Sequence, residues 1–337
     1  MESNFNFFRQ TATKSSCEDL LSLAKKVREL SHKSPHSSEL GDFKRIAAED
    51  MPIIWEFLRR EPGRTTDFSY AGVLMWVNYF NYEYAIYRNT LFIKGVVEND
   101  MSKPAFSLPV GELPLGESIA LLRDYCEANN ISLEFSAIPE YALEEMKAQA
   151  PRFVEELSDW GDYLYDAEPL ATLAGKKMSK KRNHVHQFES HYPDWKAVDM
   201  TPDNADEAMS FMDIFDLEGD STDMAKAERE LSRELINHLK NGDKELKGML
   251  LYAEGKVCAY TIGDIKGDTL FVHVEKATRN AVGSYEMINY VFAKAMSERH
   301  PEIKFINRED DAGDIGLRMA KESYHPKEIL KKYNILF

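Results

Sequence analysis

The stretch FINREDDAGDIGLRMAKESYHP, from Phe305 to Pro326, holds a strand, a charged turn and a helix in direct succession. The short apolar strand ends near Asn307, and the apolar residues after the turn recur at helical spacing. Ligands in open α/β sheets bind beyond the carboxyl ends of the strands. We therefore expect residues 307–311 to face a crevice.

The same order of elements occurs twice in the chain. A short strand, an acidic turn and a helix begin at Phe43, and a matching set begins at Trp195. Each set is followed by a hairpin, by a helix that feeds a strand, and by a final helix; the first hairpin turns at Arg88-Asn89. The offset between matching residues grows along the chain, which indicates insertions in the second copy of a diverged duplication. The sequence predicts an α/β fold of two tandem units, each with a mixed, mostly antiparallel sheet flanked by helices.

These repeats set the predicted domain organisation. Residues 1–40 contain a leader helix, Cys17 to Leu30, and a polar linker. We predict a first unit over residues 41–165, a basic linker helix over residues 166–194 and a second unit over residues 195–337.

The composition restricts the function. The 337 residues carry a formal net charge of -15, which disfavours general binding to nucleic acids or anionic membranes. A local basic patch is still compatible with this charge, because salt screens charges over about 10 Å. The three cysteines are far apart, which fits a reducing compartment and not a disulfide framework. The longest apolar run, Ala71 to Phe80, is about half as long as a membrane span requires. We predict a soluble, cytoplasmic protein without a transmembrane segment.

The end of the second unit resembles the acyltransferase fold called GNAT. Asn307, Leu317 and Tyr324 stand at places where members of that fold have an Asn, a Leu and a Tyr. The chain departs from the pattern at two places: Met319 occupies the slot of the acid tyrosine, and Val282 replaces the first glycine of the pyrophosphate loop. A valine there keeps the backbone N–H groups from closing on phosphate. This loop therefore departs from the pattern that binds coenzyme A.

A closer resemblance joins this stretch to YLYDAEPLATLAGKKMSKKRNHVHQF, from Tyr163 to Phe188. Together the two motifs resemble the C-terminal domain of phosphatidylglycerol lysyltransferases, over roughly Phe43 to Phe337. That family is similar in fold to the FemABX peptidyltransferases, with two GNAT-like units in tandem. The resemblance implies transfer of an aminoacyl group from an aminoacyl-tRNA to a lipid head group, a peptide, or a small amine or hydroxyl acceptor. The membrane-spanning region of the family's lysyltransferases is not found in these 337 residues.

The segment of residues 176–182, called the basic segment below, concentrates positive charge in this acidic chain. Its basic residues are Lys176, Lys177, Lys180, Lys181 and Arg182. An aminoacyl-tRNA donor requires a basic surface near the cleft, because phosphate contacts supply most of the affinity. In a helix, residues 176 and 180, and residues 177 and 181, would stack at i,i+4. We interpret the segment either as a phosphate-binding surface for tRNA or as a solvated linker helix paired with the protein's own acidic surface.

Aminoacyl transfer defines the candidate site residues. An aminoacyl ester is already activated, so the enzyme mainly orients its substrates and deprotonates the nucleophile. The catalytic candidates are Asn307, Arg308, Glu309, Glu275 and His325. Outside the basic segment, the candidates for binding donor or acceptor are Asp310, Arg318, Lys321 and Tyr324.

Several candidates also have a structural interpretation. Asp310 or Asp311 would cap the following helix. Arg318 and Lys321 would lie on a solvated face, and His325 would stabilise a helix end. The sequence predicts no metal site, because the rings of His184 and His186 point apart in a helix.

Three functions stay open at this point. The first is aminoacyl transfer with aminoacyl-tRNA as the donor. The second is N-acyl transfer from an acyl-coenzyme A. The third is a non-catalytic binding protein that retains the fold.

Overall fold

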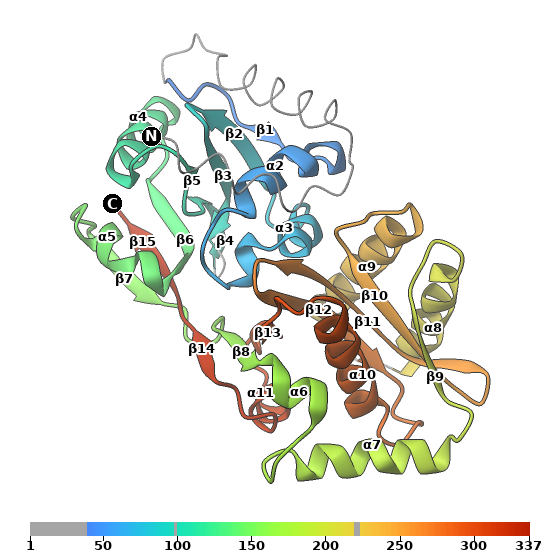
Figure 1. Ribbon diagram of the computed structural model, residues 1–337. Helices are drawn as coiled ribbons and strands as arrows, with labels where there is room; N and C mark the ends of the chain where they lie inside the picture. Colours follow the sequence, from blue (N-terminus) through green and yellow to red (C-terminus); the bar gives the residue numbers. More distant parts are fainter. Residues whose placement is uncertain (1–38, 98–99, 219–222) are drawn as a thin grey trace, which may run out of the picture.

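The computed structural model describes residues 39–97, 100–218 and 223–337. These residues form two mixed sheets flanked by helices, one in the upper and one in the lower half of the view in Figure 1. The predicted α/β fold of two units is confirmed. The predicted leader helix, Cys17 to Leu30, lies outside the described residues.

The first sheet has eight strands in the order β1-β2-β3-β4-β6-β15-β7, with β5 paired to β3. The strands are β1 (Lys44–Arg45), β2 (Glu83–Tyr87), β3 (Thr90–Val97), β4 (Asp100–Phe106), β5 (Val110–Gly111), β6 (Glu134–Pro139), β7 (Phe153–Glu156) and β15 (Lys332–Leu336). The helices around it are α2 (Met51–Leu58), α3 (Tyr70–Trp76), α4 (Leu115–Asn129) and α5 (Leu143–Lys147).

The second sheet has seven strands in the order β14-β8-β13-β12-β11-β10-β9. The strands are β8 (Asp162–Asp166), β9 (Lys196–Asp199), β10 (Lys247–Ala253), β11 (Lys256–Lys266), β12 (Thr269–Ala277), β13 (Phe305–Asn307) and β14 (Glu328–Leu330). Its helices are α6 (Ala167–Thr172), α7 (Ser179–His191), α8 (Ala205–Glu218), α9 (Asp223–Lys240), α10 (Ser284–Arg299) and α11 (Ile315–Glu322).

Both halves follow the order that the sequence repeats. The hairpin β2–β3 turns at Arg88 and Asn89, whose positive φ angles of 45° and 55° match the strand twist of a two-residue turn. Each sheet has antiparallel pairs and one parallel pair along this order, β4 with β6 and β12 with β13. Helix α9, with 18 residues, stands at the place of α3, with 7, and its greater length accounts for part of the growing offset.

The two halves exchange strands, so the predicted boundaries at residues 165 and 195 do not coincide with the sheets. Strand β8 lies near the end of the first half but pairs with β13 and β14 of the second sheet. Strand β15 ends the chain and runs between β6 and β7 of the first sheet, as the red strand in Figure 1 shows. Each sheet is therefore complete only with a strand from the other half.

The halves also share a hydrophobic core. One cluster of buried side chains joins α2 and α3 of the first half to α8, α9 and β11 of the second. Among the residues that the structure describes, no helix combines the length and hydropathy of a membrane span.

The helical prediction for the basic segment is partly wrong. Helix α7 begins at Ser179, so Lys176 and Lys177 lie in the turn before it. Leu173 ends α6 in the left-handed conformation, and Gly175 has a φ of 82°. This backbone path separates α6 from α7, and the predicted i,i+4 stacks between residues 176 and 180 and between 177 and 181 do not form.

Candidate active site

A cavity of about 380 Å³ lies where β12 and β13 separate. The two strands pair only from Thr269 to Phe271 of β12, and β13 ends at Asn307 while β12 continues to Ala277. The gap between the diverging strands, called the second-unit opening, is lined by His273 and Glu275 from β12 and by residues 308–310 after β13. This cavity is called the main cavity below.

The first half of the chain supplies much of the opposite wall. Helix α3 and the segment after it contribute Met75, Trp76, Tyr79, Phe80 and Tyr82. The site therefore belongs to both units, although its charged groups come mostly from the second.

Charged side chains in the wall are arranged largely in pairs. Arg308 binds Glu275 at 2.8 Å and lies over the ring of Tyr324, with 4.7 Å between the guanidinium carbon and the ring centre. Lys276 binds Glu228 at 2.5 Å. The Nη1 of Arg308 is buried and has no hydrogen-bond partner within the described chain. A buried donor of this kind is uncommon and often marks a functional group or a bound water.

Asp310 differs from the other carboxylates of the wall. Its Oδ1 accepts a hydrogen bond from the backbone N–H of Ala312, and no cation of the described chain lies within ion-pair distance of its carboxylate. Burial raises the pKa of the Asp310 carboxyl to about 6; Lys332 offsets part of this rise, and the neighbouring Asp162 and Glu309 add to it. The carboxyl therefore changes its protonation state close to neutral pH.

His273 lies fully buried between two carboxylates. Its Nδ1 is 2.7 Å from Oε1 of Glu309, and its Nε2 is 2.6 Å from Oδ1 of Asp264. Burial alone would lower the pKa of His273, but the hydrogen bonds to Asp264 and Glu309 outweigh it and raise the pKa to about 10. The ring is therefore an imidazolium at neutral pH, and both nitrogens donate.

Asp162, at the start of β8, is the buried centre that joins the units. Its carboxylate accepts hydrogen bonds from the backbone N–H and the hydroxyl of Thr66 and lies 2.9 Å from Nζ of Lys332. Lys332 begins β15 and also lies 3.0 Å from Asp67. Both Asp67 and Lys332 line the main cavity.

Asn307 was expected to face the crevice, and the structure corrects this expectation. Its side chain is fully buried behind the cavity, donates to the Arg64 carbonyl and to Asp162, and accepts from the backbone N–H of Glu309. These hydrogen bonds to both units hold the Asn307 side chain behind the cavity, because a buried amide needs partners for both its donor and its acceptor. Asn307 shapes the turn that carries the site.

Three other sequence candidates lie outside the cavity wall. His325 is exposed after α11 with a φ of 57°. Arg318 binds Asp159 and Asp311 on the surface. Tyr324 is buried between Arg308 and Lys181, where its ring supports both cations.

The helix cap also differs from the expectation. Asp314, and not Asp310 or Asp311, accepts from the backbone N–H of Leu317 at the start of α11. Asp311 instead accepts from Tyr163 and Arg318. Five of the site residues predicted from the sequence therefore lie in the cavity wall: Glu275, Arg308, Glu309, Asp310 and Lys321.

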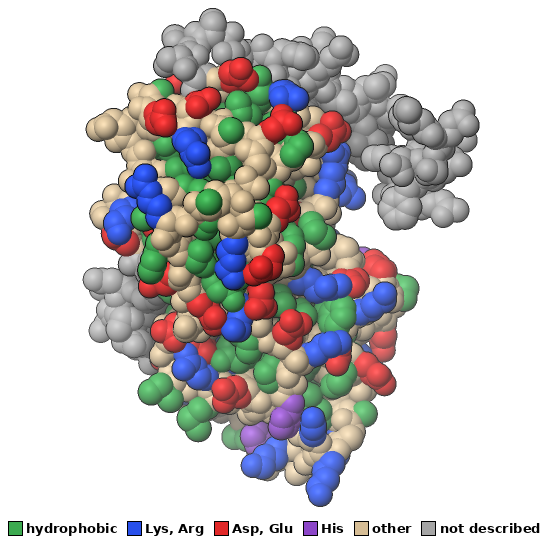
Figure 2. Space-filling model, turned by 90° about the vertical axis from the view of Figure 1, so that its left-hand side faces the viewer, with side chains coloured by type: hydrophobic (Ala, Val, Ile, Leu, Met, Phe, Trp, Pro, Cys, Tyr) green, Lys and Arg blue, Asp and Glu red, His purple; other side chains and the backbone are tan. Residues whose placement is uncertain are grey.

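The basic segment contacts the site only indirectly, through Tyr324. Lys181 lies 3.9 Å from the centre of the Tyr324 ring, on the far side of the wall from the cavity, and binds Glu286. Arg182 donates to the carbonyls of Leu173 and Gly175, so it closes the turn before α7. Lys176, Lys177 and Lys180 are exposed. Figure 2 shows Lys, Arg and His side chains gathered at the lower end of the molecule, where α7 lies in Figure 1.

Helix α7 also covers the start of α10. A side chain on Gly283, which has a φ of 79°, would place its Cβ 2.4 Å from the carbonyl oxygen of His184. Glu286, in the first turn of α10, binds Lys181 and His184. The backbone N–H groups that bind pyrophosphate at such a helix end thus face a helix and a carboxylate.

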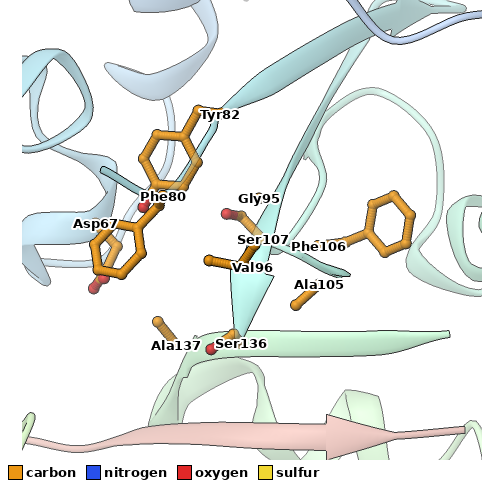
Figure 3. Close-up of a pocket in the computed structure, with 10 residues that line it drawn as sticks. All are labelled: Asp67, Phe80, Tyr82, Gly95, Val96, Ala105, Phe106, Ser107, Ser136 and Ala137. Atoms are coloured by element: carbon orange, nitrogen blue, oxygen red, sulfur yellow. The ribbon is translucent and has the colours of Figure 1, made fainter. Parts of the chain in front are cut away.

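The first unit has a counterpart of the second-unit opening, between β4 and β6. This first-unit opening holds a small cavity of about 20 Å³ (Figure 3). Asp67, Phe80 and Tyr82 line both this small cavity and the main cavity.

Sequence reasoning missed several groups of the wall. The aromatic side chains could have been found from the dense run between Trp76 and Tyr82. Asp67 and Lys332 carry no such signal, because only the strand exchange brings residues so far apart in sequence together.

Comparison with known proteins agrees with this architecture. A family model described as the C-terminal part of phosphatidylglycerol lysyltransferase matches residues 59–336. The chain belongs to this family. The predicted family and tandem GNAT-like fold are thereby confirmed, and with them the assignment to the acyltransferase class of enzymes.

Solved structures show the same arrangement. A conserved protein of unknown function from Bacteroides thetaiotaomicron is 31% identical, with a TM-score of 0.78, and the match covers 88% of this chain and 99% of that chain. L-PGS from Bacillus licheniformis shares the fold at 13% identity and a TM-score of 0.61, over 87% of this chain and 92% of that chain. FemX shares it at 9% identity and a TM-score of 0.56, over 88% and 97%.

A relative from Mycoplasmoides gallisepticum, an uncharacterised protein, is 25% identical over 176 residues. This match spans about half of each protein, 51% of this chain and 54% of the relative.

Proposed function

We propose that the protein transfers an aminoacyl group from an aminoacyl-tRNA to an amine or hydroxyl acceptor in the main cavity. The observation that carries this proposal is Asp310, a carboxyl group with a pKa of about 6 in the opening between β12 and β13. A group that titrates near the working pH is suited to act as a general base. Family membership supplies the reaction class.

The proposed step needs one base and one well-placed ester. The nitrogen or oxygen of the acceptor attacks the carbonyl carbon of the aminoacyl ester while Asp310 takes the acceptor's proton. The new bond to the acceptor forms, the bond to the ribose oxygen of the tRNA breaks, and the proton passes to that leaving oxygen. Arg308 supplies positive charge to the wall next to the carbonyl, whose oxygen becomes negative during the attack.

The basic segment supports a tRNA donor in part. Lys176, Lys177 and Lys180 are exposed near the end of α7 whose Lys181 packs on Tyr324 behind the cavity wall, so they are free to contact phosphates. Lys181 and Arg182 are bound to the protein itself and take a structural role in this proposal.

Coenzyme A is a weaker candidate for the donor. Helix α7 packs against Gly283 at the start of α10, and Glu286 places a negative charge there. Both features oppose a pyrophosphate at that helix end. A cytoplasmic setting, where charged tRNA is made, completes the proposal, with the acceptor drawn from lipid head groups, peptides or small amines.

The test is a transfer assay with each tRNA charged with its labelled amino acid. The acceptors are phosphatidylglycerol vesicles, a cell-wall peptide precursor and a set of small amines. We expect label to move to one acceptor class, and Asp310→Asn to abolish most of this transfer. Label that stays on every tRNA with every acceptor would contradict the proposal, and consumption of acetyl-coenzyme A in parallel reactions would support the alternative donor.

A further inference from the structure

The contacts of Glu309 single out one carboxylate oxygen for a ligand. Oε1 of Glu309 accepts from Nδ1 of His273 at 2.7 Å, while Oε2 has no hydrogen-bond partner within the described chain. Glu309 lines the main cavity, and its side chain is 22% exposed. One oxygen is therefore anchored and the other is open to the cavity.

The backbone at Glu309 is held in an unusual conformation. Its φ is 57°, in the left-handed region that a residue with a side chain rarely occupies. Two hydrogen bonds maintain it: the backbone N–H donates to Oδ1 of Asn307, and the carbonyl accepts from the N–H of Tyr163. Backbone strain of this kind is most often found where a side chain must be aimed.

His273 is itself fixed on the opposite side. Nε2 donates to Asp264, which also accepts from the backbone N–H groups of Tyr70 and Ala71 at the start of α3. The ring also stacks on Phe271 at 6.3 Å between centroids. His273 thus connects the first unit, through Asp264, to the carboxylate of Glu309.

The charges around Glu309 favour a cationic ligand. The other cations of the wall are bound elsewhere: Arg308 by Glu275, Lys276 by Glu228, Lys321 by the carbonyls of Arg308 and Asp310, and Lys332 by Asp67 and Asp162. His273 shares its single positive charge between two carboxylates. The adjacent Asp310 has no ion pair in the described chain, and His273 is the one cation of the described wall that pairs with Glu309, through Oε1.

We propose that Glu309 binds the α-ammonium group of the aminoacyl donor, and that His273 is the positioning residue that aims it. This inference rests on the proposed function and names the chemical feature that the site reads: a free α-ammonium next to the ester carbonyl. An N-acylated amino acid, which lacks this charge, is then a poor ligand.

Two substitutions of His273 separate its two hydrogen bonds. The amide nitrogen of His273→Asn lies near the place of Nδ1 and retains the donor to Glu309. The amide nitrogen of His273→Gln lies near the place of Nε2 and retains the donor to Asp264 only. A third variant, Glu309→Gln, keeps the shape of the side chain and removes the charge.

The binding test uses the amides of the standard amino acids, each with its N-acetylated counterpart, in calorimetry and ligand-observed NMR with the full chain. We expect at least one amide to bind, with a loss of about tenfold or more on N-acetylation, because a hydrogen bond to a charged group is broken. Glu309→Gln and His273→Gln should weaken the amide by about tenfold or more, and His273→Asn by about twofold. In the transfer assay His273→Gln should raise KM for the donor and leave kcat nearly unchanged.

Different results would overturn different parts. Equal binding of an amide and its N-acetylated form, or no effect of Glu309→Gln, would overturn the ammonium site while transfer activity still supports the proposed function. Equal losses in His273→Asn and His273→Gln would overturn the positioning role. Melting curves check the fold of each variant, and Glu309→Gln keeps the test decisive where a His273 variant fails to fold. If the unmodified protein showed no transfer activity with any donor and acceptor, this result would instead count against the proposed function.

Discussion

The two openings between parallel strands form in the same way but differ in the volume of the cavity that each holds. In each half, one parallel pair forms and then separates, β4 from β6 and β12 from β13. The second-unit opening holds the main cavity of about 380 Å³, with charged groups in its wall. The first-unit opening holds about 20 Å³, enough for a single water (Figure 3).

Aromatic side chains account for the difference. The ring of Tyr82 lies over Gly95 of β3, where an added Cβ would be 2.7 Å from it, and stacks with Phe80 at 5.8 Å between centroids. These rings stand beside the first-unit opening in Figure 3 and face the main cavity on their other side. One copy of the fold has become the wall of the site in the other copy.

The largest effect is expected from Asp310, which lines the main cavity and not the small cavity of the first-unit opening. Asp310→Asn should lower kcat of the transfer reaction by about 100-fold or more, the usual contribution of a general base. In the unmodified protein kcat/KM should rise with pH through about 6, as the carboxyl loses its proton, and the variant should lose this dependence. Steady-state kinetics across pH 5 to about 8 measure both effects.

Asp314→Asn is the matched control, because it removes one charge nearby and an asparagine still caps α11. If Asp310→Asn kept the kcat of the unmodified protein and the rise of kcat/KM with pH through about 6, Asp310 would be ruled out as the base.

A large loss of stability is expected from a change at Lys332, which lies between the two units. Lys332→Met removes the cation that faces the buried Asp162 and the half-buried Asp67, so the free energy of unfolding should fall by about 3–5 kcal/mol. Denaturant unfolding followed by circular dichroism measures the change. The neighbouring Lys331→Met breaks only an exposed pair with Glu156 and should change stability little. Similar midpoints for the two variants would contradict the view that Lys332 joins the units.

A smaller effect should follow from forcing the aromatic wall to move. In Gly95→Ala the new Cβ would push against the Tyr82 ring, at a cost of about 1–3 kcal/mol. Because Tyr82 also lines the main cavity, KM should rise as well. Gly116→Ala, in α4, is the control, since its Cβ would meet only the flexible end of Gln149, which follows α5. If Gly95→Ala were destabilised but kept its KM, the Tyr82 ring would not affect substrate binding in the main cavity.

The smallest effect is expected from the basic segment, which has no counterpart beside the first-unit opening. The double variant Lys177→Glu/Lys180→Glu should weaken tRNA binding by roughly tenfold at about 0.1 M salt and reduce its salt dependence. The control Lys244→Glu/Lys256→Glu makes an equal charge change at exposed positions elsewhere. Filter binding at several salt concentrations compares the two, and equal losses would show that only net charge matters.

Much of the fold follows from local patterns in the chain. The repeated strand, helix and hairpin order predicts two units, and the turn at Arg88-Asn89 is correct because two residues there adopt positive φ. Apolar periodicity and turn chemistry act over a few residues, so they are legible in sequence. Residues 307–311 were predicted to face the crevice because they follow a strand end, and residues 308–310 of them line the main cavity.

Other features depended on contacts between distant residues. Nothing near Asn307 indicates that Asp162 and Arg64 bury its amide, or that His273 lies between Asp264 and Glu309. The helix α7 begins three residues later than Lys176 because a left-handed turn at Gly175 precedes it.

The sequence by itself determined the two α/β units, their order of elements and the position of the charged turn, because each is encoded by neighbouring residues. Only the tertiary structure decided which opening is hollow and which side chains line it. The physical reason is the exchange of β8 and β15, which places Asp162 and Lys332 between the two units. The exchange also lets aromatic residues of the first unit fill the first-unit opening and line the main cavity of the second.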